Sequence, residues 1–242
     1  MADIKKEQER EELHRAIWAI ADELRGAVDG WDFKNYVLGT MFYRYISENI
    51  TNYINEGEHA AGNASFDYAK ISDEDAEEAR DGLIEEKGFF ILPSELFCNV
   101  RARASKDENL NETLERVFNH IEDSAKGSVS ENSFAGLFDD FDVNSNKLGA
   151  TVAKRNEKLC KLLDGIGDMN LGDVKNHDID AFGDAYEYLM KNFATESGKS
   201  KGQFYTPAEV SRVMAQVLGL HEAISTQTTI YDPTCGSGSL LL

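Results

Sequence analysis

A glycine-rich turn near the end of the sequence contains the residues best suited to chemistry. Residues 232–239 read Asp-Pro-Thr-Cys-Gly-Ser-Gly-Ser and follow residues 228–231, which we predict to form a buried strand. Glycine lacks a Cβ and lets the backbone approach a ligand closely. An acid at the carboxyl end of a strand lies where open α/β sheets bind ligands, so Asp232 suits a cationic ammonium or sulfonium group. The pattern predicts a cofactor cradle formed by Asp232, Gly236, Ser237, Gly238 and Ser239.

A second candidate site lies upstream, at Gln203, Phe204, Tyr205, Thr206, Pro207 and Ala208. Thr206 can cap a helix, Pro207 suits the first helical position, and Glu209 stands where a capping box needs its carboxylate. A helix start carries unpaired N–H groups and partial positive charge, which suit a carboxylate or phosphate. Alone, each motif has a structural explanation, as a helix cap or an ordinary strand–helix turn. Together they favour a ligand site.

Helical spacing dominates the first part of the chain, in which Pro93 is the only proline before residue 207. Apolar residues three and four positions apart predict helices over residues 9–27, 31–54, 107–124 and 152–166. The apolar stripe of the second helix is too broad for a helix with one wet face, which predicts a central position in a bundle. We predict loops at 57–63 and 125–133, and a short strand or extended segment at 88–93, ended by proline.

These patterns predict a mainly α helical domain over residues 1–175. A second unit begins near Asn176, with an amphipathic helix at 180–193, a polar loop at 195–201, a helix at 207–218 and the strand at 228–231. A parallel sheet covered by helices on both faces needs more strands than this. We therefore expect residues 176–242 to be the truncated start of an α/β Rossmann-like domain.

Composition limits the functions of this chain. A net charge of −19 argues against DNA binding by the chain alone, because DNA affinity rests largely on Lys and Arg. Apolar runs are too short for a membrane span and no export signal is present, so we expect a cytoplasmic protein without a membrane partner. Three widely spaced cysteines suit a reducing compartment.

Several further patterns are rejected as sites. The acidic run at 72–80 is interpreted as a solvated helix start or loop. Asp142, Asn144 and Asn146 resemble the start of a calcium loop, but Lys147 occupies the required glycine position. The five histidines lack the spacing of metal ligands, so no metal site is predicted.

The two motifs resemble those of a known enzyme family. The turn at 232–238 resembles the S-adenosylmethionine motif of adenine-N6 DNA methyltransferases, and Gly-Gln-Phe-Tyr-Thr-Pro at 202–207 resembles their companion cofactor motif. Residues 17–26, 37–47 and 183–189 are similar to helices of the methylation (modification) subunit of type I restriction-modification systems. The resemblance spans essentially the whole chain.

The resemblance implies S-adenosylmethionine as the cofactor, with residues 203–208 and 236–239 around its methionine end and Asp232 in support. It implies DNA as a partner through an assembled complex that holds a specificity subunit, a second methylation subunit and a restriction subunit. The family's catalytic Asn-Pro-Pro-aromatic motif acts on a flipped adenine. No two prolines are adjacent here, so we expect that motif beyond Leu242 and no catalysis by this chain alone.

Two alternatives remain open at this stage. The chain could be a helical subunit-assembly or interaction module that binds no cofactor. A methyltransferase for proteins or small molecules would share the glycine turn, but it does not predict the upstream Gln-Phe-Tyr-Thr-Pro motif or the helical domain.

Overall fold

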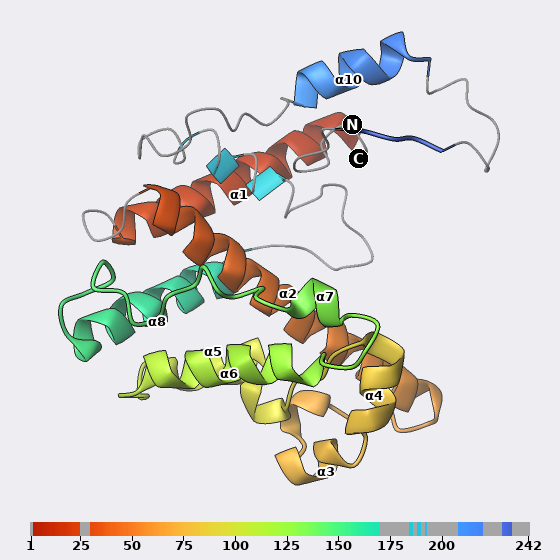
Figure 1. Cartoon of the computed structure of the whole chain (residues 1–242), viewed down its shortest axis with the longest axis vertical. Helices are drawn as coiled ribbons and strands as arrows, with labels where there is room; N and C mark the ends of the chain where they lie inside the picture. Colours follow the sequence, from red (N-terminus) through yellow and green to blue (C-terminus); the bar gives the residue numbers. More distant parts are fainter. Residues whose placement is uncertain are drawn as a thin grey trace.

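The computed structural model describes residues 2–24, 30–169, 184–185, 188–189, 192, 208–219 and 229–233. Helices account for most of these residues (Figure 1). The main helices are α1 (Ala2–Leu24), α2 (Gly30–Ala60), α5 (Phe97–Ala104), α6 (Leu110–Ser124), α8 (Val152–Asp168) and α10 (Ala208–Val217). Shorter helices are η1 (Tyr68–Lys70), α3 (Asp73–Glu77), α4 (Arg80–Lys87), η2 (Pro93–Glu95) and α7 (Glu131–Phe134). Among the described helices, none is both long and apolar enough to cross a membrane.

Helix α2 crosses the helical domain, from the end that holds α1 and α8 to the end that holds α3 and α4 (Figure 1). Its buried residues occupy more than one face, because Met41 and Tyr43 are both fully buried. The Tyr43 hydroxyl donates to the Glu95 carbonyl at 2.5 Å, and its ring packs edge-on against Phe118. The predicted central position is confirmed.

Helix α8 packs against α1, α2, α5 and α6. The side chains that it buries are those of Asn156, Leu159, Leu162, Leu163 and Ile166. Arg44 of α2 donates from its guanidinium to the carbonyls of Ile166 and Met169, at 2.7 and 2.8 Å. The last carbonyls of a helix lack partners within the helix, so Arg44 fixes the end of α8.

A close approach between α1 and α8 depends on Gly165. A Cβ at this position would lie 2.6 Å from Cγ1 of the buried Ile20 on α1. Real Cβ atoms do not come so close to a neighbouring carbon, so only glycine lets the two helices meet here.

The segment between α2 and α5 consists mainly of short helices. Ser72 caps α3 by accepting a hydrogen bond from the Asp75 amide at 3.1 Å. The acidic run at 72–80 therefore begins a helix, where negative charge is favourable. Residues 89–92 lie in neither a helix nor a strand, Leu92 has extended backbone angles, and Pro93 begins η2. The short strand predicted for 88–93 is therefore not formed, and the extended alternative holds at Leu92 but not at Gly88, which is left-handed at the end of α4.

Some predicted boundaries are wrong. Helix α2 continues through the predicted loop to Ala60 and is followed by Gly62, whose φ of +100° only glycine adopts readily. The helix predicted from residue 107 begins at Leu110, and α7 lies partly within the loop predicted at 125–133. Tyr45 and Tyr53, which belong to the predicted apolar stripe of α2, are exposed.

The predictions for residues 176–242 are partly tested. Asp184, Ala185, Tyr188, Leu189 and Asn192 are helical, in agreement with the helix predicted at 180–193, and α10 matches the helix predicted at 207–218. The loop predicted at 195–201 lies outside the described residues. Residues 229–231 form no strand, and Ile230 and Tyr231 are 54% and 86% exposed. The predicted buried strand is therefore wrong for these residues, because a strand needs a hydrogen-bonding neighbour and the described residues provide none.

Two helical glycines should respond oppositely to the same substitution. Gly165→Leu forces a side chain into Ile20 and should lower the free energy of unfolding by about 1–3 kcal/mol. Gly57→Leu should raise it by up to about 1 kcal/mol, because leucine favours helix and no other atoms lie within 4 Å of a Cβ at that position. Urea unfolding measures both changes, and equal effects would contradict the close approach of α1 and α8.

Candidate functional site

Two of the predicted cofactor residues lie in the described part of the chain. Ala208 is the first residue of α10, and Asp232 is partly buried at the end of the exposed segment 229–231. The other predicted residues lie outside the described residues: Gln203, Phe204, Tyr205, Thr206, Pro207, Gly236, Ser237, Gly238 and Ser239. The convergence of the two motifs on one ligand stays a prediction.

Helix α10 exposes an apolar face. Val210, Val213, Met214 and Val217 recur three and four positions apart and are all exposed, Val217 to 81%. Ser211 is buried. A contiguous apolar face of this kind marks a surface that packs against something else.

The helical residues upstream of the predicted cofactor loop are held against α1. Arg10 pairs with Asp184 at 2.9 Å, and the His14 ring stacks on that of Tyr188 with centroids 4.0 Å apart. Arg10 and His14 are four residues apart on α1, and Asp184 and Tyr188 are four residues apart on the facing helix. One face of each helix therefore contacts the other. Ala185 and Leu189 are fully buried in the hydrophobic core. No motif marks Arg10 or His14, and sequence reasoning missed this contact.

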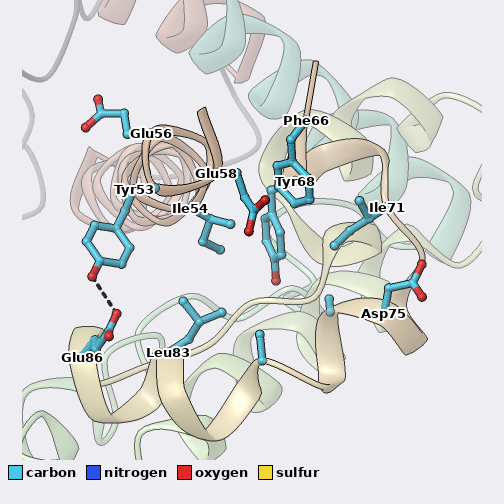
Figure 2. A pocket seen from close by; sticks show the side chains of 13 residues that line it. Tyr53, Ile54, Glu56, Glu58, Phe66, Tyr68, Ile71, Asp75, Leu83 and Glu86 are labelled. Atoms are coloured by element: carbon cyan, nitrogen blue, oxygen red, sulfur yellow. Dashed lines mark hydrogen bonds between the residues drawn. The ribbon is translucent and has the colours of Figure 1, made fainter. Parts of the chain in front are cut away.

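Sequence reasoning also missed a groove of about 790 Å³ in the helical domain (Figure 2). It lies between the last turns of α2, the residues around η1, and helices α3 and α4. None of the described cofactor residues lines it. The groove therefore involves neither Ala208 nor Asp232.

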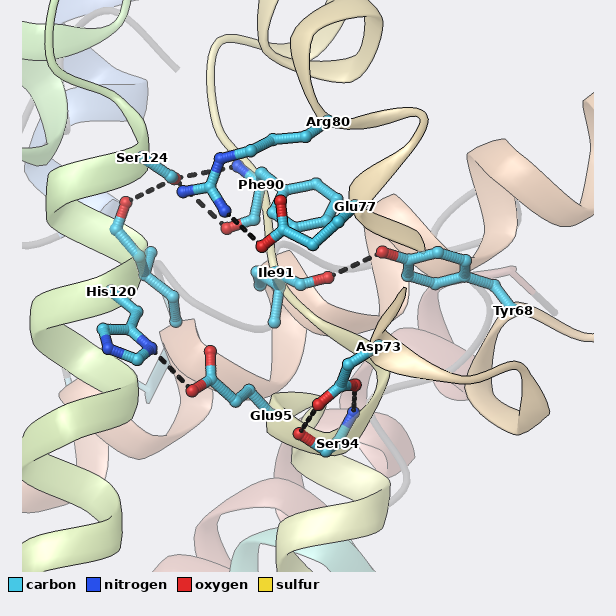
Figure 3. A network of polar contacts seen from close by, with 11 residues as sticks. Tyr68, Asp73, Glu77, Arg80, Phe90, Ile91, Ser94, Glu95, His120 and Ser124 are labelled. Atoms are coloured by element: carbon cyan, nitrogen blue, oxygen red, sulfur yellow. Dashed lines mark hydrogen bonds and ion pairs between the residues drawn. The ribbon is translucent and has the colours of Figure 1, made fainter. Parts of the chain in front are cut away.

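A buried carboxylate, that of Glu95, takes part in one of the polar contacts drawn in Figure 3. Its side chain is 6% exposed and accepts from His120 Nδ1 at 2.7 Å, with Arg116 Nε at 4.0 Å. Burial raises the pKa of the Glu95 carboxyl, and the charge of His120 opposes that shift only partly. The contact joins η2 to α6, which gives this acid–histidine pair a structural role.

Residues 13–166 match the family described as HsdM N-terminal domain, and residues 177–242 match the family described as N-6 DNA Methylase. The type I restriction enzyme MpnII methylase subunit of Mycoplasma pneumoniae is 45% identical, over 98% of this chain and 45% of that protein. The chain belongs to the family of type I restriction-modification methylation subunits.

Other relatives agree with this assignment. The type I restriction enzyme MjaIX methylase subunit of Methanocaldococcus jannaschii is 26% identical, over 96% of this chain and 38% of that protein. The crystal structure of the type I restriction-modification system methyltransferase subunit from Streptococcus thermophilus superposes with a TM-score of 0.74 and 32% identity, covering 96% of this chain and 48% of that chain. The chain spans about half the length of the relatives it matches, or less.

The attachment of the described helical residues 184, 185, 188 and 189 to the helical domain should depend on burial more than on charge. Leu189→Ala should lower the free energy of unfolding by about 2–5 kcal/mol, because it leaves a cavity in the core. Arg10→Ala should cost at most about 1 kcal/mol, because its ion pair with Asp184 is half exposed at the arginine. Urea unfolding distinguishes the two, and an equal or larger effect of Arg10→Ala would be inconsistent with this ranking.

The raised pKa of Glu95 predicts a pH dependence of stability. The folded state holds the Glu95 proton more tightly than the unfolded chain does, so stability falls as pH rises from the ordinary glutamate value of 4.5. Glu95→Gln has no such titration. The free energy of unfolding of Glu95→Gln minus that of the parent should therefore increase from pH 4.5 to about pH 6. The interval ends below the usual histidine pKa, so that histidine titration does not contribute.

Glu85→Gln, at an exposed position on α4, is the matched control for the loss of one carboxylate. Urea melts at several pH values measure both variants. If the difference in the free energy of unfolding between Glu95→Gln and the parent stays constant or decreases over the interval, burial does not raise the pKa of Glu95.

Proposed function

We propose that this chain is the N-terminal portion of a methylation subunit that, when complete, transfers a methyl group from S-adenosylmethionine to adenine N6 in DNA. The observation that carries the proposal is the pair of motifs at 203–208 and 232–239, in a chain that belongs to the type I methylation-subunit family. The activity belongs to the complete subunit, since the Asn-Pro-Pro-aromatic motif is absent from these 242 residues.

The proposed organisation has a helical domain at 1–175 and the start of a Rossmann-like methyltransferase domain at 176–242. The two family matches support the division, because one ends at residue 166 and the other begins at 177. The exposed apolar face of α10 also supports it. We expect the apolar face of α10 to pack against a β-sheet, because helices cover both faces of a parallel sheet.

The residues of the two motifs suit S-adenosylmethionine chemically. The cofactor, when bound, supplies an electrophilic methyl group on a sulfonium centre. The start of α10, near Ala208, would offer N–H groups to the cofactor carboxylate, and we assign the motif at 203–207 to the same end of the cofactor from its sequence. The Asp232 carboxylate attracts the ammonium or sulfonium group, and glycines 236 and 238 permit close approach of the backbone.

The proposed partners are a specificity subunit, a second methylation subunit and a restriction subunit, with DNA bound by the whole complex in the cytoplasm. The relatives named above are methylase subunits of type I restriction enzymes or systems. The net charge of −19 supports the need for partners, because other subunits must then supply much of the phosphate neutralisation.

Calorimetry with S-adenosylmethionine tests the proposed cofactor site. Asp232→Ala should weaken binding about tenfold, because it removes a carboxylate that faces a cation, and Gly236→Leu should abolish binding by blocking the backbone. Glu85→Ala, a loss of charge in the helical domain, should bind as the parent does. Binding that is unchanged by both site substitutions would contradict the proposed site. Absence of binding, with partner binding retained, would favour a helical assembly module.

A further inference from the structure

The groove of Figure 2 has an apolar floor within walls formed by three parts of the helical domain. Tyr68, Ala76 and Leu83 are buried at its base, and Ile54, Phe66 and Ile71 are partly exposed along it. Its volume, about 790 Å³, lies within the range of pockets that bury most of a ligand. The floor can therefore accept several apolar side chains.

Hydrogen bonds hold the walls of the groove in place. The Tyr68 amide donates to the Asn55 side chain of α2 at 2.8 Å, and the Tyr68 hydroxyl donates to the Ile91 carbonyl at 2.8 Å. The Tyr53 hydroxyl donates to Glu86 at 2.6 Å and links α2 to α4 (Figure 2). A groove formed in advance lowers the ordering cost of binding.

The charged side chains that line the groove are all acidic. Glu56 and Glu58 come from α2, Asp75 comes from α3 and Glu86 comes from α4, so carboxylates lie on opposite walls. The nearby cation Lys87 packs over the Tyr53 ring at 4.6 Å and is not part of the lining. This arrangement repels nucleic acid and disfavours a second copy of a chain with a net charge of −19.

We propose that this groove docks an amphipathic helical segment of a partner protein, with apolar side chains on one face and Lys or Arg at its flanks. Apolar anchors at positions i, i+3 or i+4, and i+7 would occupy the floor, as in other helix-in-groove complexes. The basic flanks would meet Glu58 on one wall and Asp75 and Glu86 on the other. This surface contains neither of the described cofactor residues, Ala208 and Asp232, and its proposed role does not depend on methyl transfer.

Three synthetic peptides of equal length test the proposal by fluorescence anisotropy with the whole 242-residue chain. The first has a leucine face flanked by lysines, the second replaces the lysines by glutamates, and the third has the composition of the first with the leucines dispersed. The first should bind, with affinity that falls as salt rises, and the other two should bind at least about tenfold more weakly.

A matched pair of charge reversals locates the binding. Glu86→Lys should weaken binding of the lysine peptide about tenfold, whereas Glu85→Lys on the same helix, outside the groove, should not. Glu86→Gln keeps an acceptor for Tyr53 and should have a smaller effect than Glu86→Lys. Ala79→Phe, at an exposed position of the lining, should obstruct the groove and abolish binding. Circular dichroism checks that each variant is folded.

Failure of the lysine peptide to bind would overturn the proposal, as would equal effects of Glu86→Lys and Glu85→Lys. Equal binding of the lysine and dispersed-leucine peptides would also overturn it, because the attraction would then be charge alone. If groove variants instead change self-association in sedimentation experiments, the occupant is a second copy and the proposal is wrong. None of these outcomes bears on the cofactor site, because the groove contains none of its described residues.

Discussion

The helical domain depends on the burial of α8 against helices formed much earlier in the chain. Closing so long a loop costs conformational entropy, and the apolar face of α8 compensates by filling the space between α1, α2, α5 and α6. Polar contacts then fix the end of α8. Arg44 of α2 caps its last carbonyls, and Arg101 of α5 pairs with Asp164 and Asp168. Without α8, α1 would lose the partner that Gly165 brings so close.

Helix α1 connects this core to the part of the chain that matches N-6 DNA Methylase. One set of its side chains packs on α8, through Ile20, and another contacts Asp184 and Tyr188. The segments that match the two families are therefore in contact, through His14 and Tyr188, although the proposed domain boundary lies between these segments. Helices α3 and α4, which contribute residues to the acidic groove, lie at the other end of the domain (Figure 1). One helical domain thus offers two separate surfaces, one against its own chain and one open to a partner.

The sequence predicted correctly those elements whose structure depends on neighbouring residues in the chain. The periodicity of α2, α6 and α8 predicted three long helices within a few residues of their observed bounds, except at the end of α2, and Leu92, before the proline at 93, is extended as expected. Helices α4 and α5 were not predicted, because two turns are too short to establish a period. The strand predicted at 228–231 is wrong for the described residues 229–231, because pairing depends on a neighbour that the local sequence does not reveal. The Arg10–Asp184 contact joins residues 174 positions apart, and no spacing rule reaches that far.

The cofactor motifs were identified from their residue types, and the family match supports the interpretation without testing their geometry. Photochemical cross-linking of S-adenosylmethionine labelled in its methyl group, followed by peptide mapping, tests the central claim most directly. The account predicts label in two peptides, one that contains residues 203–208 and one that contains residues 232–239. Label confined to residues 13–166, or to only one of the two motifs, would contradict a shared cofactor site.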